Sequence, residues 1–375
     1  MACKFNPKED FMKTWNQRVL GMLIFLSTLS LPPSITFAQG SLTPPGAPAP
    51  TMKSLDQIEP RTPISSVPFV ITNSGSYYLA SNLNLTVNTN AITIAANDVT
   101  LDLNGFTIYT SVLRGSGAGI LLGGGNTDIT IHNGHITGGN SPYFGSGITY
   151  SGPSPVNIHV ANVSVTECIS YGINLGTNNS TLVEGCTVQS IASYGIAAAN
   201  VSSSAAYQCG FTAIIANGTA SDCVGYGFNG DGVDAYVANN CYGNTDSGYG
   251  IYAYNALNCN GSSSTYYGVF VSYTANNCTG ISGTGTGVFT STAVNCYGYS
   301  SSSSGGGDGL YADNAQNSYG NCQGSGIGLE GFRIAIGCYG FSYSGTGLLA
   351  YTANSCLGQT LTGTAQSIVN KYNMP

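Results

Sequence analysis

Apolar and polar residues alternate over short stretches of the chain. Examples are residues 99–103 (VTLDL), 129–131 (ITI) and 156–160 (VNIHV). Alternation with a period of two predicts a β-strand with one buried face. Asn-Gly, Gly-Gly and Ser-Gly pairs separate many of these stretches, and such pairs favour turns. The pattern therefore predicts many short strands joined by tight corners.

A small residue followed by an aliphatic residue recurs along the chain at intervals of 17–28 residues. Glycine throughout, and no proline between Pro155 and Pro375, exclude helical repeats, whose units are longer and poor in glycine. Short strands at this spacing are typical of a parallel β-helix, a solenoid of stacked coils. We predict an all-β chain with about a dozen such coils. The steps are Gly119-Ile120, Gly147-Ile148, Gly172-Ile173, Gly195-Ile196, Ala213-Ile214, Gly232-Val233, Gly250-Ile251, Gly268-Val269, Gly287-Val288, Gly309-Leu310, Gly326-Ile327 and Gly347-Leu348.

Two hands of winding are compatible with coils of this length. A left-handed β-helix is built from hexapeptides, and three of them make 18 residues, the interval between Ile251 and Val269. The early coils of 23–28 residues and a slip at Cys278 break the hexapeptide register. We therefore predict right-handed winding and keep left-handed winding as the alternative.

Eleven cysteines follow Ala38, and they recur with the repeat. In several coils the cysteine lies nine residues after the register glycine, as from Gly232 to Cys241 and from Gly250 to Cys259. A constant position in each coil predicts a column along the stack. We assign to this structural core column Cys168, Cys186, Cys209, Cys223, Cys241, Cys259, Cys278, Cys296, Cys322, Cys338 and Cys356.

Three interpretations of the cysteine column compete. The thiols can be small, apolar core groups, as buried free cysteine commonly is. They can form disulfides between adjacent coils, although parallel in-register side chains point the same way and an odd number leaves one unpaired. They can bind metal, but no pair has C-x-x-C spacing and no histidine shares the column. We favour the core interpretation and predict no metal site.

The N-terminus has the pattern of a secretory signal peptide. Lys13 and Arg18 precede an apolar run over residues 19–31, and Thr36-Phe37-Ala38 is a small-x-small cleavage pattern. Cleavage near Ala38 predicts a secreted, extracellular or periplasmic protein with no membrane span in the mature chain. We divide the chain into a signal peptide (1–38), a proline-rich leader (39–68), a β-helix (69–358) and a C-terminal tail (359–375). Within the β-helix we expect an N-terminal cap (69–90), long irregular coils (91–165) and short cysteine-containing coils (166–358).

The mature chain is acidic. The full sequence has nine basic and 16 acidic residues, and cleavage after Ala38 leaves five basic and 14 acidic ones. No lysine or arginine lies between Ser116 and Phe332. Nucleic acid and anionic membrane surfaces are therefore excluded as expected partners, because both require clustered basic side chains.

Three stretches resemble a known family. They are ITNSGSYYLASNLNL (71–85), NAITIAANDVTLDLNGFTI (90–108) and NTDITIHNGHI (126–136). They resemble the entering strand and the early coils of right-handed parallel β-helix proteins of the pectate-lyase superfamily. Residues 48–65 and the ending NKYNMP also resemble a group of secreted bacterial β-helix proteins without settled activity. The resemblance implies a fold more than a chemistry.

The resemblance also implies what an active enzyme of this superfamily would contain. Its polysaccharide lyases have clustered acids for Ca²⁺ beside an arginine or lysine, whereas here the predicted β-helix holds only Arg114 and Arg333, without such a cluster. Its hydrolases carry N-T-D, D-D, G-H-G and an R-I-K-like segment, and this chain has only Asn126-Thr127-Asp128. We expect that segment to be a corner of a coil.

The low-priority catalytic candidates lie in the early coils: Asp102, Asp128, His132 and His159. If the strands align, Asp102 lies next to His132 on the outer face, with His159 one coil further. A carboxylate in that place can orient an imidazole for general base catalysis. The alternative interpretation is a solvated outer face with Asn and Asp at the corners.

Tyrosines recur beside the register glycines, and our candidate ligand-binding residues are Tyr171, Tyr194, Tyr249 and Tyr267. Such columns either offer a track for sugar rings or stack on one another without binding anything. Asp222, Asp231, Asp234 and Asp246 lack EF-hand spacing. We predict no cofactor and consider only a weak surface Ca²⁺ site there.

These observations favour a secreted binding or structural module, with polysaccharide or another cell-surface glycan as partner, over an enzyme. The alternative is a divergent polysaccharide lyase or glycoside hydrolase. The oligomeric state and the identity of the glycan do not follow from the residues.

Overall fold

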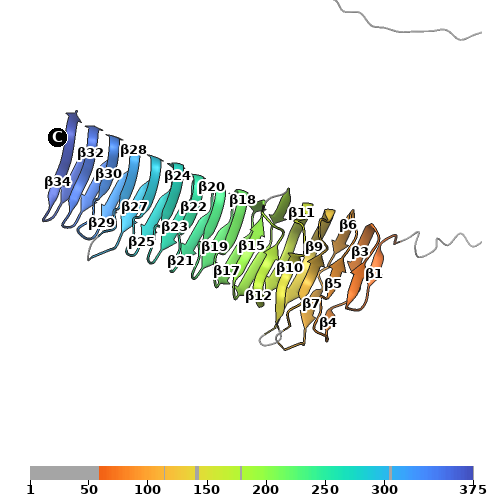
Figure 1. Ribbon diagram of the computed structural model, residues 1–375. Coiled ribbons are helices and arrows are strands. Elements are labelled where there is room, and N and C mark those ends of the chain that lie inside the picture. Colours follow the sequence, from red (N-terminus) through yellow and green to blue (C-terminus); the bar gives the residue numbers. More distant parts are fainter. Residues whose placement is uncertain (1–58, 114, 140–142, 178–179, 304–305, 375) are drawn as a thin grey trace, which may run out of the picture. The chain divides into compact units, whose positions relative to one another are not determined.

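The computed structural model describes residues 59–374, except 114, 140–142, 178–179 and 304–305. The predicted signal peptide and most of the predicted leader lie outside the described residues. The described chain forms 34 β-strands and contains no helix. Figure 1 shows these strands following one another along a single stack of coils, from β1 to β34.

The strands form three parallel stacks, and successive coils pair in register. Stack 1 contains β2 (Phe69–Ile71), β5 (Ile92–Ile94), β8 (Ala118–Leu122), β10 (Phe144–Tyr150), β12 (Cys168–Asn174), β15 (Tyr194–Ala198) and the first halves of β18 (Ile214–Ser221), β20 (Val233–Asn239), β22 (Ile251–Leu257), β24 (Val269–Asn276), β26 (Val288–Val294), β28 (Leu310–Gln316), β30 (Leu329–Ile336), β32 (Thr346–Asn354) and β34 (Thr364–Tyr372).

Stack 2 follows stack 1 in every complete coil. It contains β1 (Thr62–Ile64), β3 (Gly75–Leu79), β6 (Val99–Asp102), the first halves of β9 (Thr127–Thr137) and β11 (Val156–Thr166), β13 (Thr181–Glu184), β16 (Asn200–Ser202) and the second halves of the long strands from β18 to β34.

Stack 3 completes the coil. It contains β4 (Leu83–Leu85), β7 (Thr107–Thr110), the second halves of β9 and β11, β14 (Thr187–Ile191), β17 (Ala205–Cys209), β19 (Val224–Gly227), β21 (Tyr242–Thr245), β23 (Asn260–Ser263), β25 (Thr279–Ser282), β27 (Tyr297–Ser300), β29 (Tyr319–Cys322), β31 (Tyr339–Ser342) and β33 (Leu357–Thr360).

This arrangement confirms the predicted all-β parallel solenoid. It has about 16 turns, more than the dozen that we expected. The expected number is too small because our count begins only at Gly119 and omits Ala91-Ile92, whose Ile92 pairs with Ile120. In addition, β1, β2 and β34 belong to coils without such a step. One step was also misplaced: Leu310 and Leu348 both pair with Leu329, so the register glycine of that coil is Gly328 and not Gly326.

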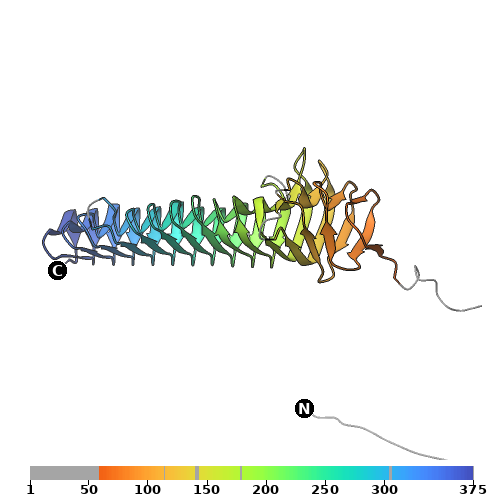
Figure 2. The same cartoon turned by 90° about the horizontal axis from the view of Figure 1, so that it is seen from below.

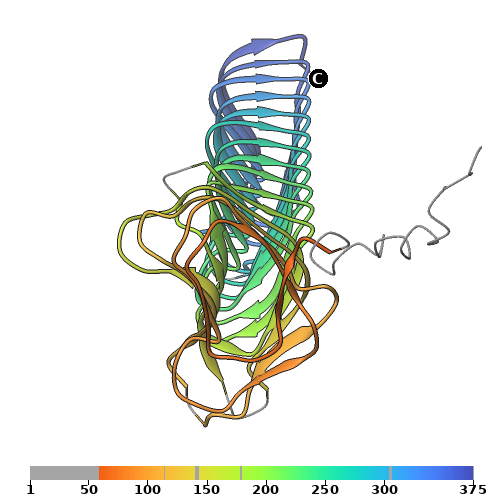
Figure 3. The ribbon, with the colours of Figure 1, turned by 90° about the vertical axis from the view of Figure 1, so that its right-hand side faces the viewer.

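Both ends of the β-helix lie further out than the predicted boundaries. β1 pairs with β3 although it falls in the predicted leader, and β34 pairs with β32 although it falls in the predicted tail. The short β1 contains Pro63, and β34 has polar residues at two core positions, so neither shows the regular alternation. Figures 2 and 3 show that loops project from the early coils, whereas the coils from β18 onward repeat with a narrower, nearly constant outline.

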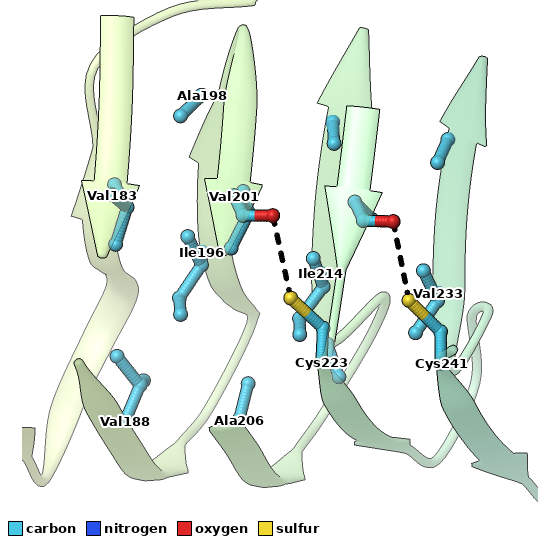
Figure 4. Packing of buried hydrophobic residues seen from close by; sticks show 14 of the residues in the cluster. Val183, Val188, Ile196, Ala198, Val201, Ala206, Ile214, Cys223, Val233 and Cys241 are labelled. Carbon is cyan, nitrogen blue, oxygen red and sulfur yellow. Dashed lines mark hydrogen bonds between the residues drawn. The ribbon is translucent and has the colours of Figure 1, made fainter. Parts of the chain in front are cut away.

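Aliphatic side chains form continuous columns inside the solenoid. In stack 1, Ile196 pairs with Ile214, then Val233 and Ile251 follow, and all four are fully buried. Figure 4 shows the side chains of Ile196, Ile214 and Val233 in the interior of the solenoid. Those of Cys223 and Cys241 point into the same interior. Each buried aliphatic side chain contributes about 1.5–3 kcal/mol. The coils are therefore held together mainly by these columns and by the strand ladders.

An asparagine precedes many of the cysteines because the corner between stacks 2 and 3 requires a left-handed residue. Asn240, Asn258 and Asn277 have φ values of 54°, 54° and 52° there. Asparagine tolerates this region better than most residues other than glycine. The following residue, Cys241, Cys259 or Cys278, then points into the core and starts the stack 3 segment.

All eleven cysteines of the described chain are buried and unpaired, but they do not form one column. Cys209 and Cys322 instead end stack 3 strands, where Cys322 pairs with Ser300 and Ser342. Cys168 opens β12 in stack 1. The prediction of a single column of eleven is therefore wrong, because cysteine also fits other inward corners. Eight cysteines share the corner before stack 3: Cys186, Cys223, Cys241, Cys259, Cys278, Cys296, Cys338 and Cys356.

Hydrogen bonds at this corner explain the choice of cysteine. Serine occupies two coils of the same column, and Cys186 and Cys296 each donate a backbone N–H to the hydroxyl of Ser204 or Ser318, one coil further, at 3.1 Å. The Cys223 thiol donates to the Ser221 carbonyl at 3.1 Å. An inward thiol or hydroxyl therefore satisfies corner groups that lie outside the strand ladder, which an alanine or valine leaves unpaired.

Candidate functional site

Asp102 and His132 lie side by side on the outer face of stack 2. Asp102 ends β6 and pairs in register with His132 of β9. His132 Nδ1 is 3.6 Å from Asp102 Oδ1, slightly beyond hydrogen-bond distance. The strand alignment that we expected for these two residues is present, and it can orient the imidazole ring.

Arg61 also binds Asp102, and the sequence did not suggest it. Its Nη1 atom is 3.1 Å from Asp102 Oδ2, and its Nε atom is 2.8 Å from Glu59 Oε1. The guanidinium group lies 4.7 Å from the centre of the Tyr78 ring. We placed Arg61 in the leader, whereas it directly precedes β1. Asp102 is therefore part of an ion-pair network with Arg61 and Glu59, and His132 lies beside this network.

His159 and Asp128 do not join this network. His159 pairs with Thr130, whereas His132 pairs with Ala161, so the two histidines belong to different columns. The expected position of His159 beyond His132 is wrong because β11 is shifted relative to that alignment. His159 Nε2 instead lies 3.1 Å from Glu184 Oε2 at the surface. Asp128 has a φ of 59° and accepts a hydrogen bond from Asn157, so it forms a corner.

Several tyrosines stack on an aromatic ring of the next coil. Tyr171 and Tyr194 have ring centroids 5.1 Å apart and planes inclined by 17°. Phe289 stacks in the same way on Phe270 and Tyr311, at 5.2 and 4.6 Å with planes within 7°. Rings in such a ladder cover one another's faces and present their edges to solvent. These ladders therefore stabilise the scaffold and offer little face area for a sugar ring.

Tyr267 belongs to the same kind of ladder. Its ring lies 5.4 Å from that of Phe289 with planes inclined by 8°, and 5.8 Å from that of Phe270 with planes inclined by 9°. Of the four candidate tyrosines, Tyr171, Tyr194 and Tyr267 thus have at least one face covered by a nearly parallel ring. Tyr249 is the exception.

The regular stacking is interrupted around Tyr249. Its ring plane is inclined by 31° to Tyr252 and by 63° to Tyr266, and Tyr266 is 52% exposed. At the bend between stacks 1 and 2, Tyr236 is 53% exposed and stacks on Tyr254 at 4.8 Å. Exposed tyrosine rings therefore gather over β20, β22 and the corners beside them.

Two hollows flank these tyrosines, and each contains one carboxylate. A hollow of about 300 Å³ is lined by Asp231 and Tyr249 together with Tyr266. Another, of about 160 Å³, is lined by Asp234 with Tyr236 and Tyr254. Asp234 of β20 pairs in register with Tyr252 of β22, and Asp231 Oδ1 accepts the backbone N–H of Tyr249 at 2.8 Å. We call these residues together the Asp231–Tyr266 surface: Asp231, Asp234, Tyr236, Tyr249, Tyr252, Tyr254 and Tyr266.

Both carboxyl groups bind protons more tightly than usual. Burial raises the pKa of Asp231 to about 6, and the nearby charge of Asp234 adds to this effect. Burial also raises the pKa of Asp234. Of the basic residues in the described ranges, Arg61 pairs with Asp102, and Arg333 and Lys371 lie on β30 and β34. The Asp231–Tyr266 surface therefore combines aromatic faces with hydrogen-bonding carboxyl groups that none of these basic residues compensates.

The four aspartates considered for Ca²⁺ do not meet. Asp222 lies at the corner before stack 3, where its carboxylate accepts a hydrogen bond from Asn240. Asp231 and Asp234 lie at stack 1, and Asp246 lies beyond the end of β21. Across the described ranges, no group of three or more His, Cys, Asp or Glu side chains could hold a metal ion.

The sequence contains a pattern that indicates this surface, but the pattern is recognised only when the pairing of residues in adjacent coils is known. Asp231 and Asp234 are each followed 18 residues later by a tyrosine, Tyr249 and Tyr252. Because 18 residues is one coil here, acid and ring become neighbours in adjacent coils. The acids were grouped with Asp222 and Asp246 instead, since the columns were not aligned.

Comparisons with known proteins assign the chain to no family. No protein-family model and no curated protein matches the chain. The A-module of mannuronan C-5 epimerase AlgE4 from Azotobacter vinelandii is similar over 79% of this chain and 88% of its own, with 11% identity and a TM-score of 0.45. The enzymatically active domain of tailspike protein 2 of bacteriophage CBA120 is similar over 79% of this chain and 47% of its own, with 12% identity and a TM-score of 0.27.

The three parallel stacks define the class of protein: the described chain is an all-β parallel β-solenoid. None of the described residues forms a helix that could span a membrane.

Proposed function

We propose that the chain is a secreted β-helix that binds carbohydrate on the Asp231–Tyr266 surface. The observation that carries this proposal is the coincidence of exposed tyrosine rings and two hollows on adjacent coils, each lined by a carboxyl group. Sugars bind through their apolar ring faces to aromatic rings and through their hydroxyl groups to carboxylates and amides. The surface supplies both kinds of contact.

The charge of this surface favours neutral glycans. Asp231 and Asp234 have no basic partner within the described chain, so a uronate or sulfate group placed there would meet uncompensated negative charge. Hydroxyl groups, in contrast, can donate hydrogen bonds to both carboxylates. We therefore expect neutral polysaccharides to bind better than acidic ones. A nucleic acid partner remains disfavoured for the same reason.

The location of the protein and the hand of the helix belong to the same proposal. The signal-peptide pattern before Ala38 supports secretion or periplasmic location, where extracellular glycans are accessible. The resemblance of residues 71–85, 90–108 and 126–136 to pectate-lyase superfamily proteins supports right-handed winding over the left-handed alternative.

One experiment distinguishes binding from turnover. The protein is incubated with a panel of neutral and acidic polysaccharides, while retention on immobilised glycan, unsaturated products and reducing ends are all measured. Retention on neutral glycans without products supports the binding module. Absence of retention on every glycan would contradict it.

A divergent polysaccharide lyase or glycoside hydrolase is the second candidate function. It is favoured by one observation, the position of His132 Nδ1 at 3.6 Å from Asp102. Turnover in the panel that is abolished by His132→Ala or Asp102→Ala, and kept in His159→Ala, would establish this function instead. His159 is a suitable control because it lies in another column.

A further inference from the structure

The last coil leaves a long strand edge without a partner among the described residues. β34 pairs with β32 over nine residues, and no other described strand pairs with it. A free edge of this length is a template for pairing with another chain. Proteins commonly protect such edges with short strands, proline or inward-pointing charges.

The core columns end in polar residues at this coil. Gln366 pairs with Leu348, so it occupies the aliphatic column of stack 1. Lys371 pairs with Ala353, so it occupies the alanine column of stack 2, whose earlier members Ala315 and Ala335 are fully or almost fully buried. Apolar residues in earlier coils are thus replaced by an amide and an ammonium group where the stack ends.

The two polar side chains meet across the end of the core. Lys371 Nζ donates a hydrogen bond to Gln366 Oε1 at 3.4 Å. Between them Ile368, opposite Ala350, remains apolar and packs on the core. Met374 covers the cysteine column, where its sulfur accepts the backbone N–H of Cys356 at 3.1 Å. The lysine stem can therefore cover apolar surface while its charge stays in water.

The position of Lys371 is specific among the basic residues of the described chain. Arg61 pairs with Asp102 on the outer face, and Arg333 is exposed at the bend of β30. Of these three, only Lys371 takes an inward column. A second coil placed over β34 would bury its ammonium group at the end of the alanine column, which is costly for an unpaired charge.

We propose that Gln366 and Lys371 form a polar cap that keeps the edge of β34 from pairing with a second copy of this chain. The pairing that the cap prevents is tail to tail, between two β34 strands. Among the described residues, the opposite end offers the three-residue strands β1, β2 and β4, and Pro63 of β1 has no N–H to donate. Two identical edges that pair antiparallel give a closed dimer rather than a fibre.

The test compares self-association of the wild type with that of Gln366→Leu/Lys371→Ala by sedimentation velocity over a range of concentrations. We expect the variant to dimerise at least tenfold more strongly than the wild type. Two control variants keep the comparison specific. Gln366→Glu/Lys371→Arg retains a polar cap, and Ser367→Leu adds apolar area at an exposed position of the same strand. Both should associate as weakly as the wild type.

Each other outcome overturns the proposal. Association of the double variant no stronger than that of the wild type would show that the cap has no such role. Equal association of Ser367→Leu would assign the effect to apolar area in general. Oligomers larger than dimers would contradict tail-to-tail pairing. Lys371→Met keeps most of the length of the side chain and removes the ammonium group that binds Gln366. It provides an independent variant should the double variant fold poorly, and it should also dimerise more strongly than the wild type.

Discussion

Cys338 donates its backbone N–H to the thiol sulfur of Cys356, one coil further along the solenoid, at 3.3 Å. The same bond is made to the hydroxyl groups of Ser204 and Ser318 in other coils of the column. The cysteines before stack 3 are therefore polar groups in a structural position, and serine is their natural substitute.

This equivalence predicts that two substitutions of Cys356 differ in their cost. Cys356→Ser keeps an acceptor for the Cys338 N–H and should change the free energy of unfolding by less than about 1 kcal/mol. Cys356→Val leaves that N–H unpaired and should cost about 1–3 kcal/mol more. Denaturant unfolding of the two variants measures the difference. Equal stability of both variants would contradict the role assigned to the sulfur.

Burial also predicts that the thiols are unreactive in the folded protein. All eleven described cysteines are buried, which limits the access of a reagent to the sulfur atoms. Burial also raises the pKa of Cys168 and Cys209 to about 12, so that these two hold little thiolate at mildly alkaline pH. Titration with a thiol reagent should label almost none of the eleven cysteines of the described chain before unfolding and all eleven afterwards. An even number of blocked thiols in the unfolded protein would instead indicate disulfides between coils.

The aromatic ladders should matter for stability rather than for binding. Phe289 stacks on Phe270 and Tyr311, and each such pair contributes about 0.5–1.5 kcal/mol beyond burial. Phe289→Ala should therefore lower the free energy of unfolding by at least about 1 kcal/mol. The folded variant should still bind glycan as strongly as the wild type. Lost retention in a variant that is fully folded would place the ladder in the binding site.

Asp231 should make stability depend on pH. Its pKa is raised from 3.8 to about 6 in the folded state, so the folded state binds the proton more tightly than the unfolded state. The resulting destabilisation is absent below about pH 4 and complete above about pH 6. Asp231→Asn should thus be more stable than the wild type above about pH 7, by up to about 3 kcal/mol, and this difference should vanish toward about pH 4.

The amide introduced by Asp231→Asn would still offer an oxygen to the Tyr249 N–H, so the hydrogen bond is kept. The exposed Asp246→Asn is a suitable control for the change in net charge. Thermal unfolding at several pH values provides the measurement. A stability difference that is independent of pH would contradict a raised pKa at Asp231.

Local pattern was sufficient to predict strands, their parallel stacking and the inward position of the cysteines. It underestimated the number of coils because the terminal coils are atypical: β1 contains Pro63, and β34 carries Gln366 and Lys371 at core positions. A terminal coil has a core on one side only. It therefore lacks the alternation by which the inner coils are recognised.

The candidate site depended on register, which local pattern determines poorly. Asp102 and His132 were placed together because their strands share a four-residue pattern, whereas His159 was misplaced by one column. Arg61 was missed because it precedes a three-residue strand. The Asp231–Tyr266 surface was missed because its acids and rings become neighbours only when successive coils are aligned residue by residue.

The most direct test of the account measures glycan affinity for variants of the Asp231–Tyr266 surface. Affinity electrophoresis in gels that contain neutral polysaccharides compares the wild type, Tyr266→Ala, Asp231→Asn and Tyr351→Ala. Tyr351 is a similarly exposed tyrosine of β32, away from the two hollows. We predict that at least one neutral glycan retards the wild type and Tyr351→Ala equally, and that Tyr266→Ala and Asp231→Asn bind at least tenfold more weakly. No retardation by any glycan, or an equal loss in Tyr351→Ala, would contradict the proposed carbohydrate-binding surface.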